Sequence, residues 1–188
     1  MYFDSFPVIV YDSVGNGTYK DVTNILRRVA MRSKIKQNTL IYDTYDVKEG
    51  ETPEMIADRL YNDPELHWVI LIVNDITDRY HQWPLSTSQF LAFINDKYVN
   101  ADGTSNVDGV HHYEIPQSSG DTKTKIEVYQ NSALYTGDSD FYASASIVTN
   151  FEYEENEQDE KRKIRLLDPS YIDQFVTEFK ALMKESII

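Results

Sequence analysis

The stretch that most constrains the fold is residues 42–74, because its turns and helix starts are marked by specific side chains. Thr52-Pro53 and Asp63-Pro64 each place a capping oxygen before a proline, which has no N–H group to leave unpaired at the start of a helix. Gly50 lies in a polar turn that follows β-forming residues and calls for a positive φ. Residues 66–73 are apolar nearly all round. The stretch therefore predicts a strand, a helix beginning at Pro53 and a second, buried helix.

A set of residues along this stretch forms a recognisable pattern: Tyr45, Val47, Gly50, Glu51, Thr52, Ile56, Ala57, Asn74 and Ile76. With these residues the stretch resembles a LysM module, a small βααβ unit best known for binding N-acetyl sugars of peptidoglycan or chitin. By that resemblance, the extended segment Trp83-Pro84-Leu85 is expected to supply the closing strand.

Further runs along the chain extend the pattern: 61–69 (YNDPELHWV), 74–75, 78–85 (DRYHQWPL), 164–167, 173–175 and 182–184. These runs are similar to one particular family, the LysM-like wedge protein in the baseplate of T-even-like, contractile-tailed bacteriophages. The resemblance implies a late, structural protein of the virion, assembled in the host cytoplasm. It implies that the protein joins neighbouring wedges and docks on wedge core subunits, with other wedge proteins as partners. It implies no enzymatic activity and no cofactor.

The whole chain is expected to have an α+β fold in three parts. The first part is an arm and an amphipathic helix, the second is the LysM-like module, and the third combines a helix, a β-hairpin-rich middle region and a C-terminal amphipathic helix. Their boundaries are 1–41, 42–86 and 87–188. In the third part, strands are expected over 110–115, 123–129 and 141–148, a β-hairpin over 147–154 and 161–167, and the last helix after Asp168-Pro169.

The N-terminal arm, residues 1–19, combines aromatic and β-branched residues with a turn at Gly15-Asn16-Gly17. It is too short to form a core of its own and is expected to lie against something else, such as another subunit. The apolar spacing that follows predicts a helix over about 20–33.

The other side of this predicted helix is basic, with Arg27, Arg28 and Arg32 among its residues, in a chain of net charge −13. It is either a solvated face paired with the acidic remainder or a surface for an acidic patch on a neighbouring protein. Nucleic acid fits less well, because no aromatic residues are interleaved with the charges and the net charge opposes a phosphate backbone.

Composition excludes several other classes. The chain has no cysteine, which excludes disulfides and thiolate metal sites. No run reaches the roughly 18 apolar residues of a membrane span, and no signal peptide is visible. We therefore expect no membrane partner.

Four aromatic residues are candidate anchors for a protein partner, although each fits the core equally well. They are Tyr61, Trp68, Tyr80 and Trp83.

No catalytic, cofactor-binding or metal-binding residue is predicted, and no small-molecule substrate. HExxH, Walker and GxSxG motifs are missing from the sequence. His111 and His112 are neighbours on an expected strand, where side chains point to opposite faces and cannot hold one metal ion without a bulge. Three classes therefore remain: a structural wedge subunit, a glycan-binding LysM protein as the alternative, and, with least support, an enzyme.

Overall fold

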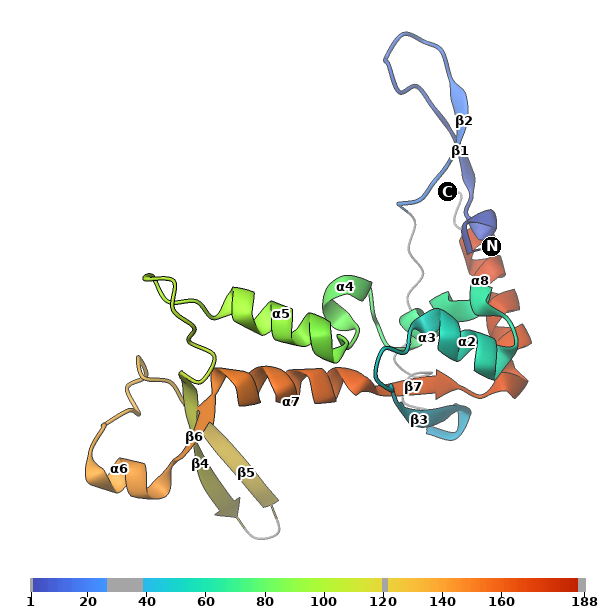
Figure 1. Cartoon of the computed structure of the whole chain (residues 1–188). Helices are drawn as coiled ribbons and strands as arrows, with labels where there is room; N and C mark the ends of the chain where they lie inside the picture. Colours follow the sequence, from blue (N-terminus) through green and yellow to red (C-terminus); the bar gives the residue numbers. More distant parts are fainter. Residues whose placement is uncertain (1, 27–38, 120–121, 186–188) are drawn as a thin grey trace. The chain divides into compact units, whose positions relative to one another are not determined.

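A computed structural model describes residues 2–26, 39–119 and 122–185 (Figure 1). Helices and strands are mixed along the chain, which confirms the α+β class. The chain forms two compact units, and the first is built from two separate segments. It comprises residues 1–83 and 162–188, and the second unit comprises residues 84–161.

The first unit contains elements from both ends of the chain. In chain order they are η1 (Tyr2–Ser5), β1 (Val8–Tyr11), β2 (Lys20–Thr23), η2 (Thr39–Ile41), β3 (Tyr42–Asp46), α2 (Pro53–Tyr61), η3 (Pro64–Leu66), α3 (His67–Val73), α4 (Arg79–Gln82), β7 (Lys163–Leu167), η4 (Pro169–Tyr171) and α8 (Ile172–Glu185).

The predicted helix starts are confirmed. The Thr52 hydroxyl accepts from the Met55 amide at 3.4 Å, and α2 begins at Pro53. The Asp63 carboxylate accepts from the Glu65 amide at 2.8 Å, and η3 leads directly into α3. Gly50 has the expected positive φ of 69°. Local side-chain chemistry therefore sets the start of α2 and the start of the η3 turn that precedes α3.

The strand that pairs with β3 is β7, and the prediction that Trp83-Pro84-Leu85 closes the module is wrong. The two strands are antiparallel, with Tyr42 opposite Leu167 and Asp46 opposite Lys163. Proline lacks the N–H that a ladder needs, so the 83–85 segment is a poor strand. In β7, by contrast, Ile164 and Leu166 alternate with charged residues and are buried.

Helix α3 lies between two apolar clusters of the first unit. One contains Trp68, Val69 and Val73 together with residues of α8. The other contains Ile70 with residues of α2 and β7. Because α3 packs on both sides, it needs apolar residues around nearly its whole circumference, as the sequence predicts.

The predicted helix over 20–33 is wrong at its start, because Lys20–Thr23 form strand β2. This strand pairs antiparallel with β1, and the pairing overrides the helical spacing of the apolar residues. Residues 27–38 lie outside the described residues.

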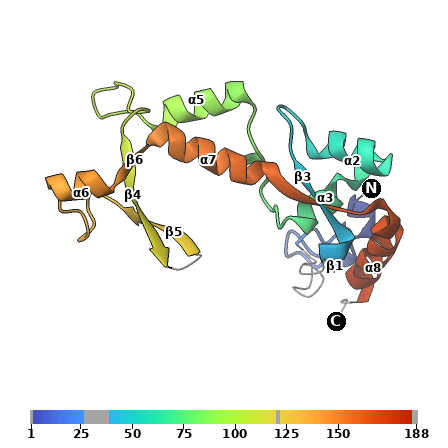
Figure 2. The same cartoon turned by 90° about the horizontal axis from the view of Figure 1, so that it is seen from below.

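The second unit contains a three-stranded sheet and three helices among its described residues (Figure 2). The sheet has the order β5-β4-β6, with antiparallel pairs. The elements are α5 (Thr87–Lys97), β4 (Val110–Ser119), β5 (Thr122–Val128), α6 (Ser139–Ser144), β6 (Ser146–Thr149) and α7 (Asn150–Arg162). The expected strand over 141–148 is thus divided between α6 and β6.

The predicted hairpin over 147–167 is wrong, because residues 150–162 form helix α7. Thr149 and Glu152 form reciprocal capping bonds: the Glu152 carboxylate accepts from the Thr149 amide at 2.8 Å, and the Thr149 hydroxyl accepts from the Glu152 amide at 3.2 Å. Four of the six residues expected to form the hairpin tip, 155–160, are Glu or Gln, which are strong helix formers.

Candidate protein-protein interface

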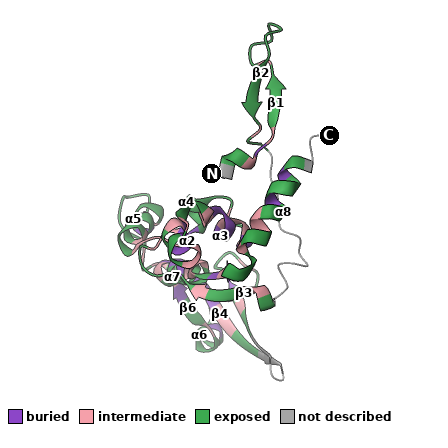
Figure 3. Ribbon diagram, turned by 90° about the vertical axis from the view of Figure 1, so that its right-hand side faces the viewer, coloured by how far each residue is buried: buried purple, intermediate pink, exposed green. Residues whose placement is uncertain are grey.

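The N-terminal ribbon, strands β1 and β2, exposes apolar side chains on both of its faces. All eight strand residues are exposed, which Figure 3 shows in green. The register places Val8 and Val10 on one face, and Ile9, Tyr11 and Val22 on the other. Val10 is 67% exposed. Two exposed apolar faces on one ribbon are typical of a surface that another molecule covers.

Apolar exposure continues at the tip and beyond the end of the ribbon. The exposed residues there are Val14, Tyr19, Ile25 and Leu26. Phe3 is exposed as well, whereas Phe6, just before β1, is buried with Trp68 and residues of α8. The chain is thus anchored to the core immediately before the exposed ribbon begins.

The tip of the ribbon is organised by the carboxylate of Asp12. It accepts hydrogen bonds from the amides of Gly15 and Gly17, both at 2.7 Å, and from those of Val14 and Asn16. These backbone bonds, that of Gly17 first, hold the pKa of Asp12 below its ordinary value. Gly15 and Gly17 both have positive φ, as the turn requires. The tip therefore has a defined conformation.

Three of the four predicted aromatic anchors lie within the first unit's own packing. Trp68 and Trp83 are each only 7% exposed. The Trp83 indole donates to the Glu51 carbonyl at 2.9 Å, and the Tyr61 hydroxyl donates to the Leu167 carbonyl at 3.0 Å. These side chains offer little surface to a partner.

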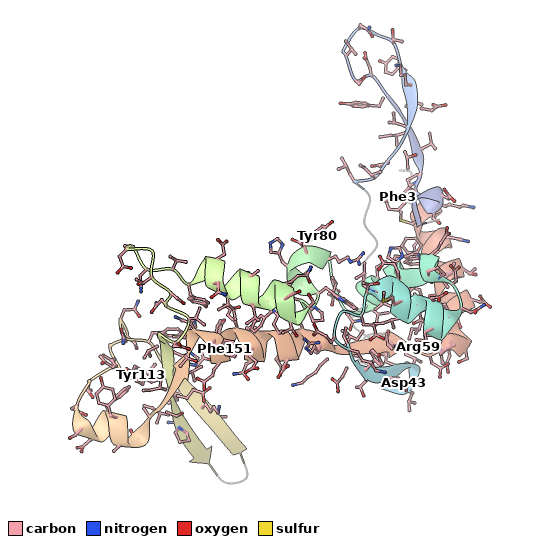
Figure 4. The ribbon with its side chains drawn as sticks, viewed as in Figure 1. Phe3, Asp43, Arg59, Tyr80, Tyr113 and Phe151 are labelled. Atoms are coloured by element: carbon pink, nitrogen blue, oxygen red, sulfur yellow. The ribbon has the colours of Figure 1, made fainter. Side chains whose placement is uncertain are left out.

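Tyr80, the fourth anchor, is 87% exposed on α4, and Figure 4 labels it. Its neighbour Arg79 forms an ion pair with Glu54 at 2.5 Å. The structure does not bring Tyr80 together with the other three anchors in one surface. Arg27, Arg28 and Arg32 lie outside the described residues, so the acidic-patch interpretation stays a prediction.

The second unit contains a buried carboxylate, that of Glu154 on α7. It accepts from the Lys97 ammonium at 2.6 Å and from the Tyr98 hydroxyl at 2.7 Å. Burial alone would raise the pKa of Glu154, but these two hydrogen bonds outweigh it and the pKa is lowered. The charge is therefore paired, and it joins α7 to the end of α5.

His111 and His112 meet, because a bulge shifts the register of β4 between Val110 and His112. Their Nδ1 atoms are 2.8 Å apart, and the His111 ring stacks on Tyr153 with centroids 3.8 Å apart. The buried Nε2 of His112 has no hydrogen-bond partner among the described residues. Burial, and then the neighbouring His112, lower the pKa of His111.

This pair is not completed into a metal site. In residues 2–26, 39–119 and 122–185, no group of three His, Asp or Glu side chains is placed to hold a metal ion. Over the same residues, no helix is both long enough and apolar enough to cross a membrane.

Comparison with known proteins shows the family to which the chain belongs. The family model described as "Base plate wedge protein 53" matches residues 1–182. The chain belongs to the baseplate wedge protein 53 family. It is also 25% identical over 150 residues to "Baseplate wedge protein gp53" of Enterobacteria phage T4, covering 76% of this chain and 74% of that protein.

Members of the baseplate wedge protein 53 family are structural components of the phage tail baseplate, and this chain is therefore a virion protein that assembles with other baseplate proteins. The resemblance drawn from the sequence is confirmed at that level. Neither match describes a glycan-binding protein, so the glycan alternative gains no support from them.

The N-terminal ribbon is the feature of this wedge protein that sequence reasoning identified only in part. The sequence predicts an arm over residues 1–19, but it predicts a helix where β2 lies. A signal was present: two short β-forming runs flank a loop that contains Gly15 and Gly17.

Proposed function

We propose that this protein joins neighbouring wedges of the baseplate and docks on wedge core subunits by protein-protein contacts, without catalysis. One observation supports a role in protein-protein contacts: every residue of β1 and β2 is exposed, although most of these residues are apolar. Burying such side chains on association is favourable at about 25 cal/mol per Å² of apolar surface.

The proposed partners are other wedge proteins in a hetero-oligomeric complex, with no part for nucleic acid, membrane or a small molecule. Tyr80 is a second candidate contact, because an exposed aromatic side chain offers a large area at little entropic cost. Arg27, Arg28 and Arg32 are proposed to meet an acidic surface of a neighbouring subunit.

The test is reconstitution of the full-length chain with the other wedge proteins of the same phage, followed by sedimentation velocity. We expect the wild-type chain to form larger species at micromolar concentration. The double variant Val14→Ser/Tyr19→Ser should weaken this association at least tenfold. Leu91→Gln, at an exposed apolar residue of α5 in the second unit, is the matched control and should not.

Unchanged sedimentation of the wild-type mixture would overturn the proposal. Retention of the purified chain on insoluble peptidoglycan would also count against it and would favour the glycan alternative.

A further inference from the structure

The outer edge of β1 carries backbone groups that the ribbon itself does not use. The Asn24 amide donates to the Pro7 carbonyl at 2.8 Å, and hydrogen-bonded pairs alternate along an antiparallel ladder. The remaining hydrogen-bonded pairs that follow from the register are Ile9 with Val22 and Tyr11 with Lys20. The N–H and C=O groups of Val8 and Val10 therefore point away from β2.

No other strand of the described chain covers this edge. The sheet that contains β1 has two strands only, over residues 2–26, 39–119 and 122–185. A two-stranded ribbon is at best marginally stable in water, and a third strand or a packed face is needed for independent stability. Within the described residues the ribbon has neither a third strand nor a packed face, because the residues on both of its faces are exposed.

The edge of β1 also lacks the features that keep an open edge from pairing. Its sequence is Val8-Ile9-Val10-Tyr11, with no charged residue and no proline within the strand. Natural edge strands are usually protected by lysine, proline or a bulge. The outer edge of β2 differs, because Asp21 is charged and the Thr23 carbonyl already accepts from the Ile25 amide at 3.0 Å. Of the two edges, that of β1 is the one suited to a further strand.

We propose that the outer edge of β1 receives an extended segment of another baseplate protein, so that the ribbon becomes part of a sheet formed by two different chains. This inference rests on the proposed function. The backbone of the added segment bonds to the N–H and C=O groups of Val8 and Val10. The side chains of the added segment that lie beside Val8 and Val10 are expected to be β-branched or aromatic, because they share a face on which β1 is apolar.

The test compares two substitutions at Val10 in the full-length chain. Val10→Pro removes the outward N–H, which the β1–β2 ladder does not use, and blocks the edge. Val10→Thr keeps the N–H and the β-branched shape. The probe is the mixture of the other wedge proteins of the same phage. We expect Val10→Pro to weaken binding at least tenfold, which corresponds to about 1.4 kcal/mol, and Val10→Thr to remain within threefold of wild type.

Hydrogen exchange of the wild-type chain gives a readout that needs no variant. With fragmentation to single amides, Val8 and Val10 should exchange rapidly in the free chain and at least tenfold more slowly in the complex. The Ile9 and Tyr11 amides already bond within the ribbon, so slower exchange at these two alone would report a more stable ribbon and not an added strand.

The outcomes separate this inference from the proposed function. If the wild-type chain does not bind the wedge proteins, both are overturned. If it binds, but Val10→Pro binds equally well and the Val8 and Val10 amides are not slowed, strand addition is overturned and the proposed function stands. If the chain alone forms dimers that Val10→Pro abolishes, the added strand comes from a second copy, and the assignment to another protein is overturned.

Discussion

Replacing Trp68 by alanine separates a core role from a partner-binding role for one of the two buried tryptophans among the candidate anchors. The Trp68 ring lies 4.4 Å from that of Phe179 and 6.1 Å from that of Phe175, measured between centroids. A large aromatic side chain buries about 150–250 Å², worth about 4–6 kcal/mol at 25 cal/mol per Å². Measured losses for Phe or Trp to Ala in cores are about 3–5 kcal/mol. We therefore expect Trp68→Ala to destabilise the first unit by about 3–5 kcal/mol.

Urea denaturation followed by tryptophan fluorescence measures this loss. The chain has two tryptophans, and Trp83 lies in the same unit as Trp68, so the variant keeps its own reporter. With a slope of about 2 kcal/mol per M, the midpoint should fall by about 1.5–2.5 M. Tyr80→Ala is the control: at 87% exposure it should change the free energy of unfolding by no more than about 0.5 kcal/mol.

The opposite pattern would refute the reasoning. If Trp68→Ala unfolds at the wild-type urea concentration but no longer assembles with wedge proteins, Trp68 is an interface anchor. The packing against Phe175 and Phe179 would then not describe the folded chain.

Three further predictions concern ionisable groups. Glu154→Gln removes the charge that Lys97 neutralises in a buried setting and should lower the stability of the second unit by about 1–3 kcal/mol in thermal melts. Burial and His112 lower the pKa of His111 in the folded chain, so the unfolded chain binds a proton at His111 more readily. The contribution of His111 to the free energy of unfolding should therefore be full above about pH 6.5 and decline below it. The variant His111→Phe should flatten this decline, measured by urea titrations at pH 7.5 and 5.5. Asp12→Ala should speed amide exchange of residues 14–17 and leave the global urea midpoint unchanged, because only the exposed tip depends on that carboxylate.

Local chemistry made the helix starts predictable. Thr52, Asp63 and Asp168 each precede a proline, and each caps the turn that follows, because the capping bond joins residues two or three positions apart. Ser86 and Gln89 likewise form the capping box that opens α5. Such bonds depend on a few adjacent residues, so one sequence is enough to identify them.

The errors concern pairing between distant residues and the choice between helix and strand in charged segments. Nothing within residues 42–86 indicates that β3 pairs with residues 163–167, because that choice depends on which strand completes the core. Alternating charges predict a hairpin with arms over 147–154 and 161–167, yet the Thr149 and Glu152 capping pair and the glutamates favour a helix over 150–162. The buried Glu154 site could not be anticipated, because its partner Lys97 lies far away in the sequence.

The large separation in sequence between β3 and β7 has a consequence for folding. Because β3 pairs with residues 163–167, the first unit cannot complete its sheet until the chain has been synthesised beyond Leu167. Next to this strand pair, the Val47 amide donates to the Arg162 carbonyl at 2.9 Å, and the Arg162 guanidinium donates to the Val47 carbonyl at 3.2 Å. The strands of the second unit are closer together in sequence, and contacts of low sequence separation form faster. We therefore expect the second unit to gain protection from hydrogen exchange before the first during refolding; simultaneous protection of β3 and β4 would contradict this order.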